Sequence, residues 1–415
     1  MAKPFGPDWR LWERICWSVL SLSPDRPRSG DSGFVPITRP VCFRTRAFFL
    51  ASPHGLCLGC WRLYRPLEKM ALPSWPALLE HLLQGHDLDM AQATELMRGW
   101  LADGIEPVLT GALLAALRAK GVNGEELAAM ALVLRQACPV PEQRPAMPLV
   151  DTCGTGGDGT ESFNISTAVA FTAAACGAAV AKHGNRSASG RVGSADVLEA
   201  LGIHLQAPAD QVIEALTQTG ITFLFAPGWH PALVGLAPLR RCLGVRTVFN
   251  LLGPLVNPLA PEAQVLGVAR ADLLDPMADA LSRLGLARAV VVHGHGGMDE
   301  ASLSGPSELR LMEGGRVWGE ELDPEALGLM RAPIEALIGG DLSANRRILE
   351  GVLKGEGTPP QQAVVALNAA LVLWAAGLSD SITAALPRCL EAIEVGAPWQ
   401  KLEALRRSLP VPSGG

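Results

Sequence analysis

A glycine-rich run that leads into a helix-forming segment is the strongest chemical signal in this chain. Residues 151–167 hold four glycines within six positions, which excludes a regular helix or strand interior there. The four are Gly154, Gly156, Gly157 and Gly159. Asn164, Ser166 and Thr167, which are residue types that cap helices, follow the run, and the alanine-rich stretch 168–180 strongly favours helix. Because such a loop presents free N–H groups and the positive end of a helix dipole, it suits a phosphate.

Two cations strengthen the phosphate interpretation. Lys182 and Arg186 lie one helix further along the chain, where a crossover returns the backbone to the same end of a sheet. The loop matches neither the dinucleotide pattern G-x-G-x-x-G nor the G-K-[ST] ending of a P-loop. Taken alone it is equally compatible with an ordinary turn. With the cations it predicts a site for a phosphate ester or pyrophosphate.

A second candidate site follows the apolar run 289–293. The run ends in a glycine-rich loop that carries the adjacent carboxylates of Asp299 and Glu300. Ligands bind at the carboxyl ends of parallel strands, and hard carboxylate oxygens together with phosphates suit Mg²⁺. The alternative for this pair alone is a solvated acidic turn. We interpret His293 and His295 as a strand-end residue and a loop residue.

Two arginines form the third candidate site. Arg240 and Arg246 lie in a segment rich in proline and glycine, and a guanidinium group can bind a carboxylate through two hydrogen bonds. The alternative for either arginine is a salt bridge on a helix surface.

Composition limits the class of protein. The chain has 415 residues, of which 48% are hydrophobic and 18% charged, which suits a two-domain protein with a buried sheet. Residues 70–415 hold 24 basic and 36 acidic side chains, so we expect no nucleic acid as the main partner. No apolar run is long enough to span a bilayer, and no secretory signal is evident, so we expect no membrane association.

The first 69 residues differ from the rest. They carry eleven basic and five acidic side chains, and no helical or strand period persists in them. We interpret 1–69 as an extension that is disordered or not native, with the protein proper beginning at Met70 in the cytoplasm. The alternative is an organelle transit peptide, because the stretch is rich in arginine and poor in acidic residues.

From Met70 onward, periodicity predicts two kinds of domain. Four amphipathic helices are expected at 73–86, 90–103, 106–120 and 124–138. Short apolar runs that alternate with helices predict a mostly parallel sheet. The predicted strands are 149–152, 179–182, 221–225, 264–268 and 289–293. A hairpin is expected at 308–312 and 316–318 around Gly314 and Gly315, and C-terminal helices at 364–376 and 382–394. The expected fold class is α/β, a small all-helical domain beside a larger α/β domain.

Together these segments resemble the anthranilate phosphoribosyltransferase family over residues 70–409. The matching motifs, in family order, are Gly154-Thr-Gly-Gly-Asp158, Asn164-Ile-Ser-Thr167, Lys182-His-Gly-Asn-Arg186, Gly193-Ser-Ala-Asp196, His230-Pro-Ala232, Arg246-Thr-Val-Phe-Asn-Leu-Leu-Gly-Pro254 and Asp299-Glu300. The resemblance implies a nucleoside phosphorylase/phosphoribosyltransferase-like fold. Its helical domain would comprise 70–142 with helices from about 228–245, and its α/β domain 148–227 and 246–410. It also implies a homodimer formed through the helical domain.

The resemblance further implies an enzyme that transfers a phosphoribosyl group from phosphoribosyl pyrophosphate to anthranilate, with Mg²⁺, in tryptophan biosynthesis. Implied contacts to phosphoribosyl pyrophosphate are Gly154, Gly157, Asp158, Ser162, Asn164, Ile165, Ser166, Thr167, Lys182, His183, Gly184, Asn185, Arg186, Ser187, Ala188, Ser189, Gly190 and Ser194. Implied contacts to anthranilate are Gly154, Asn185 and Arg240, and implied metal ligands are Ser166, Asp299 and Glu300. No general base is assigned.

Two other functions stay open at this point. A pyrimidine-nucleoside phosphorylase shares the architecture and a similar glycine loop, but it needs neither Arg240 as a carboxylate-binding residue nor the Asp299–Glu300 pair. A non-enzymatic nucleic-acid-binding relative of the same fold would be expected to have a basic body. Val192 is a mild departure from the family, whose members often carry serine there.

Overall fold

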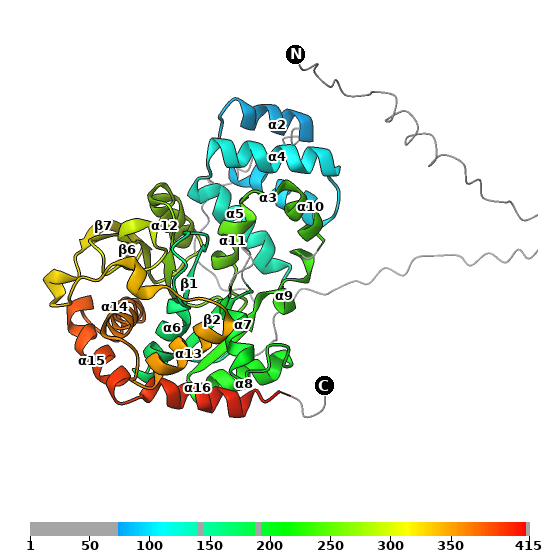
Figure 1. The fold of residues 1–415 in the computed structure, drawn as a ribbon. Helices are drawn as coiled ribbons and strands as arrows, with labels where there is room; N and C mark the ends of the chain where they lie inside the picture. Colours follow the sequence, from blue (N-terminus) through cyan, green and yellow to red (C-terminus); the bar gives the residue numbers. More distant parts are fainter. Residues whose placement is uncertain (1–73, 140–143, 187–191, 234, 412–415) are drawn as a thin grey trace, which may run out of the picture. The chain divides into compact units, whose positions relative to one another are not determined.

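The computed structural model describes residues 74–139, 144–186, 192–233 and 235–411, within a compact unit that begins at Met70 (Figure 1). The predictions for residues 1–69, and for Ser187, Ala188, Ser189 and Gly190, lie outside the described residues.

The four predicted N-terminal helices are present. They are α2 (Trp75–Leu83), α3 (Met90–Leu101), α4 (Pro107–Lys120) and α5 (Gly124–Gln136). Reciprocal hydrogen bonds between the N-cap and the third helical residue fix the starts of α3 and α5, with Asp89 and Asn123 as the caps. Two short helices from later in the chain, α10 (Ala237–Leu243) and α11 (Phe249–Leu252), join this bundle, and Phe249 is buried in its core.

The sheet has seven strands in the order β3-β2-β1-β4-β5-β6-β7. The strands are β1 (Val150–Gly154), β2 (Val180–Gly184), β3 (Ile221–Phe225), β4 (Ala263–Gly267), β5 (Arg288–His293), β6 (Ser307–Glu313) and β7 (Arg316–Leu322). Neighbouring strands from β3 to β5 pair in parallel, and β6 and β7 form the predicted antiparallel hairpin. Its turn uses Gly314 and Gly315 at positive φ, 58° and 81°.

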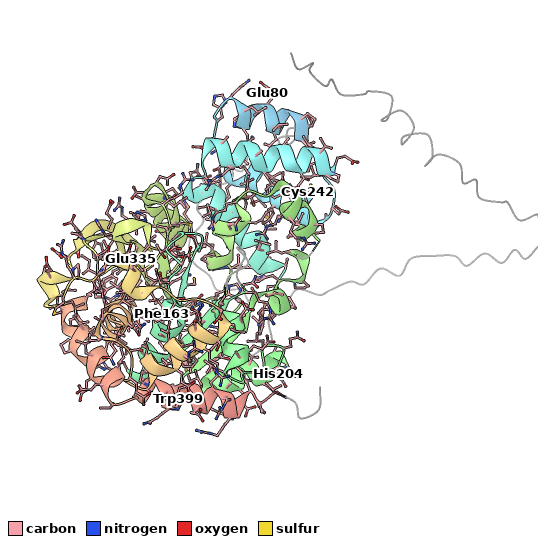
Figure 2. All side chains as sticks on the ribbon, in the orientation of Figure 1. Glu80, Phe163, His204, Cys242, Glu335 and Trp399 are labelled. Atoms are coloured by element: carbon pink, nitrogen blue, oxygen red, sulfur yellow. The ribbon has the colours of Figure 1, made fainter. Side chains whose placement is uncertain are left out.

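The sheet separates two hydrophobic cores, because successive side chains of its strands point alternately into one core and the other. On β5, Val290 and Val292 belong to one core, while Ala289 and Val291 belong to the other. Helices α6 (Ile165–Ala175) and α14 (Pro359–Ala375) pack in the first core, and α12 (Leu274–Arg283) packs with α5 in the second. Side chains fill the space between sheet and helices (Figure 2), and Phe163, labelled there, is 1% exposed. The expected fold class is therefore confirmed, with a helical bundle and a larger α/β part.

The remaining helices complete the layers around the sheet. They are α7 (Ser194–Ala200), α8 (Ala209–Thr219), α9 (Ala226–Trp229), α13 (Leu342–Leu353), α15 (Ile382–Glu394) and α16 (Ala397–Ser408). Neither α13 nor α16 was expected from the sequence, although α13 is amphipathic and buries Leu349, Val352 and Leu353 on one side. In the part of the chain that the structure describes, no helix is both long and apolar enough to cross a membrane.

Candidate active site

The glycine-rich run forms a loop at the carboxyl end of β1. Gly156, Gly157 and Gly159 take positive φ values of 64°, 73° and 78°, which side chains other than glycine rarely adopt. Gly154 is needed for a different reason, because a Cβ added there would lie 2.0 Å from Oδ2 of Asp299. The backbone N–H of Gly156 donates to that same oxygen at 2.7 Å. The loop is therefore built around the predicted carboxylate.

Helix α6 starts directly after the loop. Asn164 is its N-cap residue, as its type suggested, but its side chain makes no capping hydrogen bond. Its Nδ2 instead donates to the carbonyl of Val192 at 3.1 Å. This contact uses the backbone carbonyl of Val192. The valine side chain, which replaces the serine common in the family, takes no part in it.

Lys182 lies in the middle of β2 and is only 3% exposed. Its Nζ donates to the carbonyl of Thr152 at 2.7 Å and to Oγ of Ser166 at 3.2 Å. Burial lowers the pKa of Lys182, and the nearby carboxylate of Asp151 opposes that shift. Burial in turn raises the pKa of Asp151 to about 6. The chain thus holds a cation beneath the loop, next to the start of α6.

Two histidines meet behind Lys182. His183, at the end of β2, and His230, which follows α9, lie edge to face with ring centroids 5.2 Å apart. Nδ1 of His183 is 3.1 Å from the carbonyl oxygen of Gly253, while Nε2 of each ring is buried without a partner among the described residues. Burial lowers the pKa of His183 to about 3 and also lowers that of His230. Both rings are therefore neutral at physiological pH.

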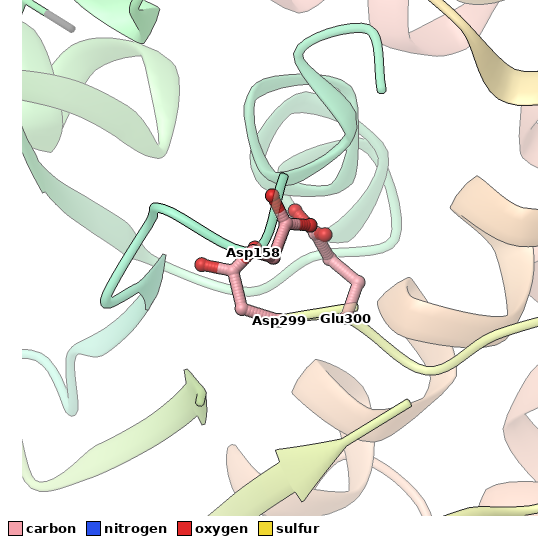
Figure 3. Close-up of side chains that lie close together, drawn as sticks. All are labelled: Asp158, Asp299 and Glu300. Carbon is pink, nitrogen blue, oxygen red and sulfur yellow. The ribbon is translucent and has the colours of Figure 1, made fainter. Parts of the chain in front are cut away.

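Three carboxylates converge above the sheet (Figure 3). Asp158 comes from the glycine loop, while Asp299 and Glu300 come from the loop after β5, and one oxygen of each lies within 4.8 Å of the others. Burial and the charge of Asp158 raise the pKa of Asp299 to about 6. Burial and the charge of Asp299 raise the pKa of Glu300 well above its ordinary value. Such a set of hard oxygens can hold a divalent cation.

The three metal ligands predicted from the sequence lie close together in the structure. Ser166, Asp299 and Glu300 line one small cavity beside the carboxylate cluster. Asp158, predicted only as a contact to phosphoribosyl pyrophosphate, joins them as a further candidate ligand.

Arg240 and Arg246 reach the same region from the helical side. The Arg240 guanidinium lies over the ring of Phe249, 5.4 Å from its centroid, and within the described residues no carboxylate pairs with it. Arg246 Nη2 donates to the carbonyl of Thr155 at 2.7 Å. A Cβ on Gly157 would lie 1.8 Å from Nη1 of Arg246, so this arginine packs directly on the glycine loop. Within the ranges that the structure describes, neither arginine forms the surface salt bridge considered as an alternative.

Arg186 has carboxylate partners of its own. It contacts Asp196 at 2.6 Å and Glu199 at 2.8 Å, both on α7, while remaining beside the site. Its positive charge near the phosphate site is therefore partly offset in this structure.

A cavity of about 370 Å³ collects most of the predicted residues. The predicted residues that line it are Gly154, Gly157, Ser162, Asn164, Ile165, Ser166, Lys182, His183, Gly184, Asn185, Arg186, Ser194, Arg240, Asp299 and Glu300. Asp158 contributes through the carboxylate cluster, whereas Thr167 does not line the cavity and is fully buried. The cavity therefore joins glycine-loop amides, cations and carboxylates at one edge of the sheet, which suits a phosphate-rich ligand with a divalent cation.

Several residues of the site were missed by the sequence analysis. Phe249 and Asn250 line the cavity, and Gly267 approaches the backbone of Asp299 so closely that a Cβ would lie 1.5 Å from its carbonyl oxygen. Asn250 lies within the motif that begins at Arg246, so its position was visible but its role was not. Nothing in the local sequence marks Gly267, because its contact is with a residue far along the chain.

Comparison with protein families gives matches to both parts of the chain. The model for the glycosyl transferase family, a/b domain, matches residues 146–398. The model for the glycosyl transferase family, helical bundle domain, matches residues 76–138.

Curated relatives match over nearly their whole length. An anthranilate phosphoribosyltransferase of Parasynechococcus marenigrum (strain WH8102) is 64% identical over 352 residues, which is 85% of this chain and 99% of the relative. That of Prochlorococcus marinus (strain MIT 9313) is 64% identical over 344 residues, 83% of this chain and 98% of the relative.

Solved structures show the same fold. The crystal structure of anthranilate phosphoribosyltransferase from Thermus thermophilus is 46% identical with a TM-score of 0.74, covering 80% of this chain and 98% of that one. The Saccharomyces cerevisiae enzyme in complex with phosphoribosyl pyrophosphate and Mg has a TM-score of 0.73, covering 81% of this chain and 98% of that one. At 24% identity, this second match carries only the fold.

Proposed function

We propose that this chain, which belongs to the anthranilate phosphoribosyltransferase family, transfers the 5-phosphoribosyl group of phosphoribosyl pyrophosphate to the amine of anthranilate. The products are N-(5-phosphoribosyl)anthranilate and pyrophosphate, and the reaction is the second step of tryptophan biosynthesis from chorismate. The observation that carries this function is the 64% identity to curated enzymes over nearly their whole length. The two alternatives, a nucleoside phosphorylase and a nucleic-acid-binding relative, are not favoured by any of these matches.

We assign phosphoribosyl pyrophosphate to the side of the cavity formed by the glycine loop and the start of α6. The backbone of the glycine loop, at positive φ, and the buried ammonium of Lys182 are suited to phosphate oxygens. The contacts of Ser187, Ala188, Ser189 and Gly190 to phosphoribosyl pyrophosphate stay a prediction, because these residues lie outside the described ranges.

We propose that Asp158, Asp299 and Glu300, with the hydroxyl of Ser166, hold Mg²⁺. The three carboxylates offer the hard oxygens that Mg²⁺ prefers. Burial, together with their mutual repulsion, raises the pKa of Asp299 and Glu300. Oε2 of Glu300 is buried without a hydrogen-bond donor among the described residues, so a ligand position is free. When bound, Mg²⁺ supplies positive charge to the pyrophosphate oxygens.

We assign anthranilate to the part of the cavity beside Gly154, Asn185 and Arg240. Arg240 is the cation that suits its carboxylate, because its guanidinium lines the cavity and has no acidic partner in the described part of the chain. The ring of Phe249 beneath it holds that guanidinium in place.

The chemistry follows from these positions. The amine nitrogen attacks C1 of the ribose, the bond from C1 to the pyrophosphate oxygen breaks, and the nitrogen then loses a proton. Because an aromatic amine is already neutral at pH 7, no residue is needed to free the nucleophile. The chain's own contribution is to hold both substrates in contact and to place Lys182 where negative charge develops on the leaving group.

We also propose a homodimer formed through the helical bundle. An apolar cavity of about 720 Å³ lies between the segment that joins α3 to α4 and the segment around α10. Val108 on its rim is 88% exposed, and Cys242, labelled in Figure 2, is exposed as well. A second copy related by a twofold axis would cover this surface in both subunits. Sedimentation should give a dimer that Val108→Glu weakens, and a wild-type monomer at micromolar concentration would contradict the proposal.

The proposed activity is tested by the loss of anthranilate fluorescence. We expect the full chain to remove the fluorescence only when phosphoribosyl pyrophosphate and Mg²⁺ are both present. Fluorescence that stays constant under these conditions, together with phosphorolysis of a pyrimidine nucleoside, would replace the proposal with the phosphorylase alternative.

A further inference from the structure

A second cavity, of about 360 Å³, adjoins the substrate cavity. The two cavities share Thr155, Gly157, Arg246 and Asn250 as lining residues. The other walls of the second cavity come from the end of α4, the turn before α5, and the segment after β4 that leads into α12. It therefore lies where the helical bundle meets the α/β part, and Gly157 is the one lining residue that it shares with the assigned substrate contacts.

Four cations line this cavity, and two of them already have partners. Lys120 lies 2.5 Å from Asp87, and Nε of Arg270 lies 2.8 Å from Asp272. These two acidic residues are the only carboxylates that line the cavity among the described residues. The carboxylates that line the cavity therefore neutralise only two of its four cations.

The other two cations, Arg118 and Arg246, pair with no carboxylate in the described part of the chain. Burial lowers the pKa of Arg246, and the charges of Asp299 and Asp158 oppose that shift. The charge of Arg118 lowers it further, so the two guanidinium groups are close enough to interact. Among the described residues, Nη2 is the one nitrogen of the Arg246 guanidinium that has an acceptor, the carbonyl of Thr155. Two like charges that face one cavity repel each other, and a bound anion between them removes that repulsion.

A buried hydroxyl lines the same cavity. Thr247 is 4% exposed, and its Oγ1 has no hydrogen-bond partner in the described chain. Its backbone N–H is already bonded to Oδ1 of Asn250 at 2.9 Å, so the residue is held in place. Buried hydroxyl groups normally have partners, and an anion in the cavity would accept this one.

We propose that this second cavity binds a phosphate-type anion, with the guanidinium groups of Arg118 and Arg246 and the hydroxyl of Thr247 as donors. The inference rests on the proposed function for its choice of ligand, because that reaction releases pyrophosphate in the adjoining cavity. Pyrophosphate is the occupant to which we commit. Because Arg246 also holds the carbonyl of Thr155, the occupant contacts the residue that packs on the glycine loop.

Calorimetry with inorganic pyrophosphate and Mg²⁺ on the full chain tests the proposal. We expect two pyrophosphate ions per wild-type chain and one per Arg118→Gln chain, and Arg118→Lys should keep both. Thr247→Val should weaken binding of the second ion at least about tenfold, because one hydrogen bond to a charged acceptor is lost. The matched control is Arg98→Gln on α3, which removes an exposed arginine paired with Glu95 and should leave both ions bound.

Inhibition kinetics give an independent readout. Pyrophosphate that binds only at the substrate site competes strictly with phosphoribosyl pyrophosphate, whereas a second site adds a non-competitive component. We expect that component in wild type and its loss in Arg118→Gln, with turnover otherwise within about twofold, since Arg118 is exposed and lies outside the substrate cavity. Displacement of the second ion by ribose 5-phosphate or by inorganic phosphate would identify other sources of the same ligand class and also supports an anion site.

The inference would be overturned if the wild-type chain bound a single pyrophosphate ion. It would also be overturned if the Arg118→Gln chain still bound two pyrophosphate ions. Failure of the proposed function has a different signature, which is a wild-type chain that leaves anthranilate fluorescence unchanged whatever its pyrophosphate stoichiometry.

Discussion

Replacing Gly267 with alanine should abolish activity although this residue does not line the substrate cavity. A Cβ at Gly267 would lie 1.5 Å from the carbonyl oxygen of Asp299, and that neighbour is backbone that cannot rotate away. Ordinary contact at about 3.4 Å or more requires the Asp299 backbone to move by roughly 2 Å. Because a displacement of about 1 Å in a positioned group can cost about 100-fold, we expect turnover to fall by at least that factor.

The assay is anthranilate turnover as a function of Mg²⁺, with the melting temperature measured in parallel. Gly267→Ala should require more Mg²⁺ for half-maximal rate, because Asp299 is a proposed ligand. The matched control is Gly228→Ala, since a Cβ there meets nothing within 4 Å and should leave rate and melting temperature unchanged. Turnover within threefold of wild type and an unaltered Mg²⁺ requirement would refute the reasoning.

Three further predictions concern other parts of the account. Arg240→Ala should weaken the apparent affinity for anthranilate about ten- to a hundredfold, because a charge-assisted pair is lost. The control is Arg241→Ala, at the exposed neighbouring residue, which should leave that affinity unchanged. Equal weakening of the affinities for both substrates would show that Arg240 has a structural role. Because the pKa of Asp299 is raised to about 6 and that of Glu300 well above normal, Mg²⁺ binding should release protons, and Mg²⁺ affinity should fall as pH drops through about 6. Calorimetry in buffers of different ionisation enthalpy measures this release, and its absence at pH 7 would contradict these shifts. A chain that starts at Met70 should keep its turnover and melting temperature, because composition and charge change at that residue. A large fall in melting temperature would contradict this prediction. A processed native N-terminus between residues 1 and 70 would favour import into an organelle over a cytoplasmic location.

The sheet was largely predictable because buried parallel strands appear in a sequence as short apolar runs. The run 221–225 coincides with β3, and the other four parallel strands were placed within two residues of their observed ends. The convergence of Lys182 with Asp299 was also predictable in outline. Lys182 belongs to one parallel strand of the sheet and Asp299 follows another, and the carboxyl ends of such strands share an edge.

The rest of the site depends on contacts between residues far apart in the chain, which no local sequence pattern indicates. Gly267 resembles any other glycine at a strand end until Asp299 is placed against its backbone. The unpaired hydroxyl of Thr247, buried beside Arg246, is likewise a property of the packed chain. Asp158 was predicted to contact phosphoribosyl pyrophosphate, and only the turn of the glycine loop brings it to the carboxylate pair.

The most direct test of the account compares wild type with the double variant Asp299→Ala/Glu300→Ala at limiting Mg²⁺. Product mass and released pyrophosphate are measured by mass spectrometry and a pyrophosphate assay, with melting temperature as the control for folding. We predict that wild type forms phosphoribosyl anthranilate and pyrophosphate in equal amounts, while the folded double variant loses at least about 100-fold in rate. Turnover by the double variant equal to that of wild type would contradict the carboxylate site, and the absence of product in wild type would contradict the proposed function itself.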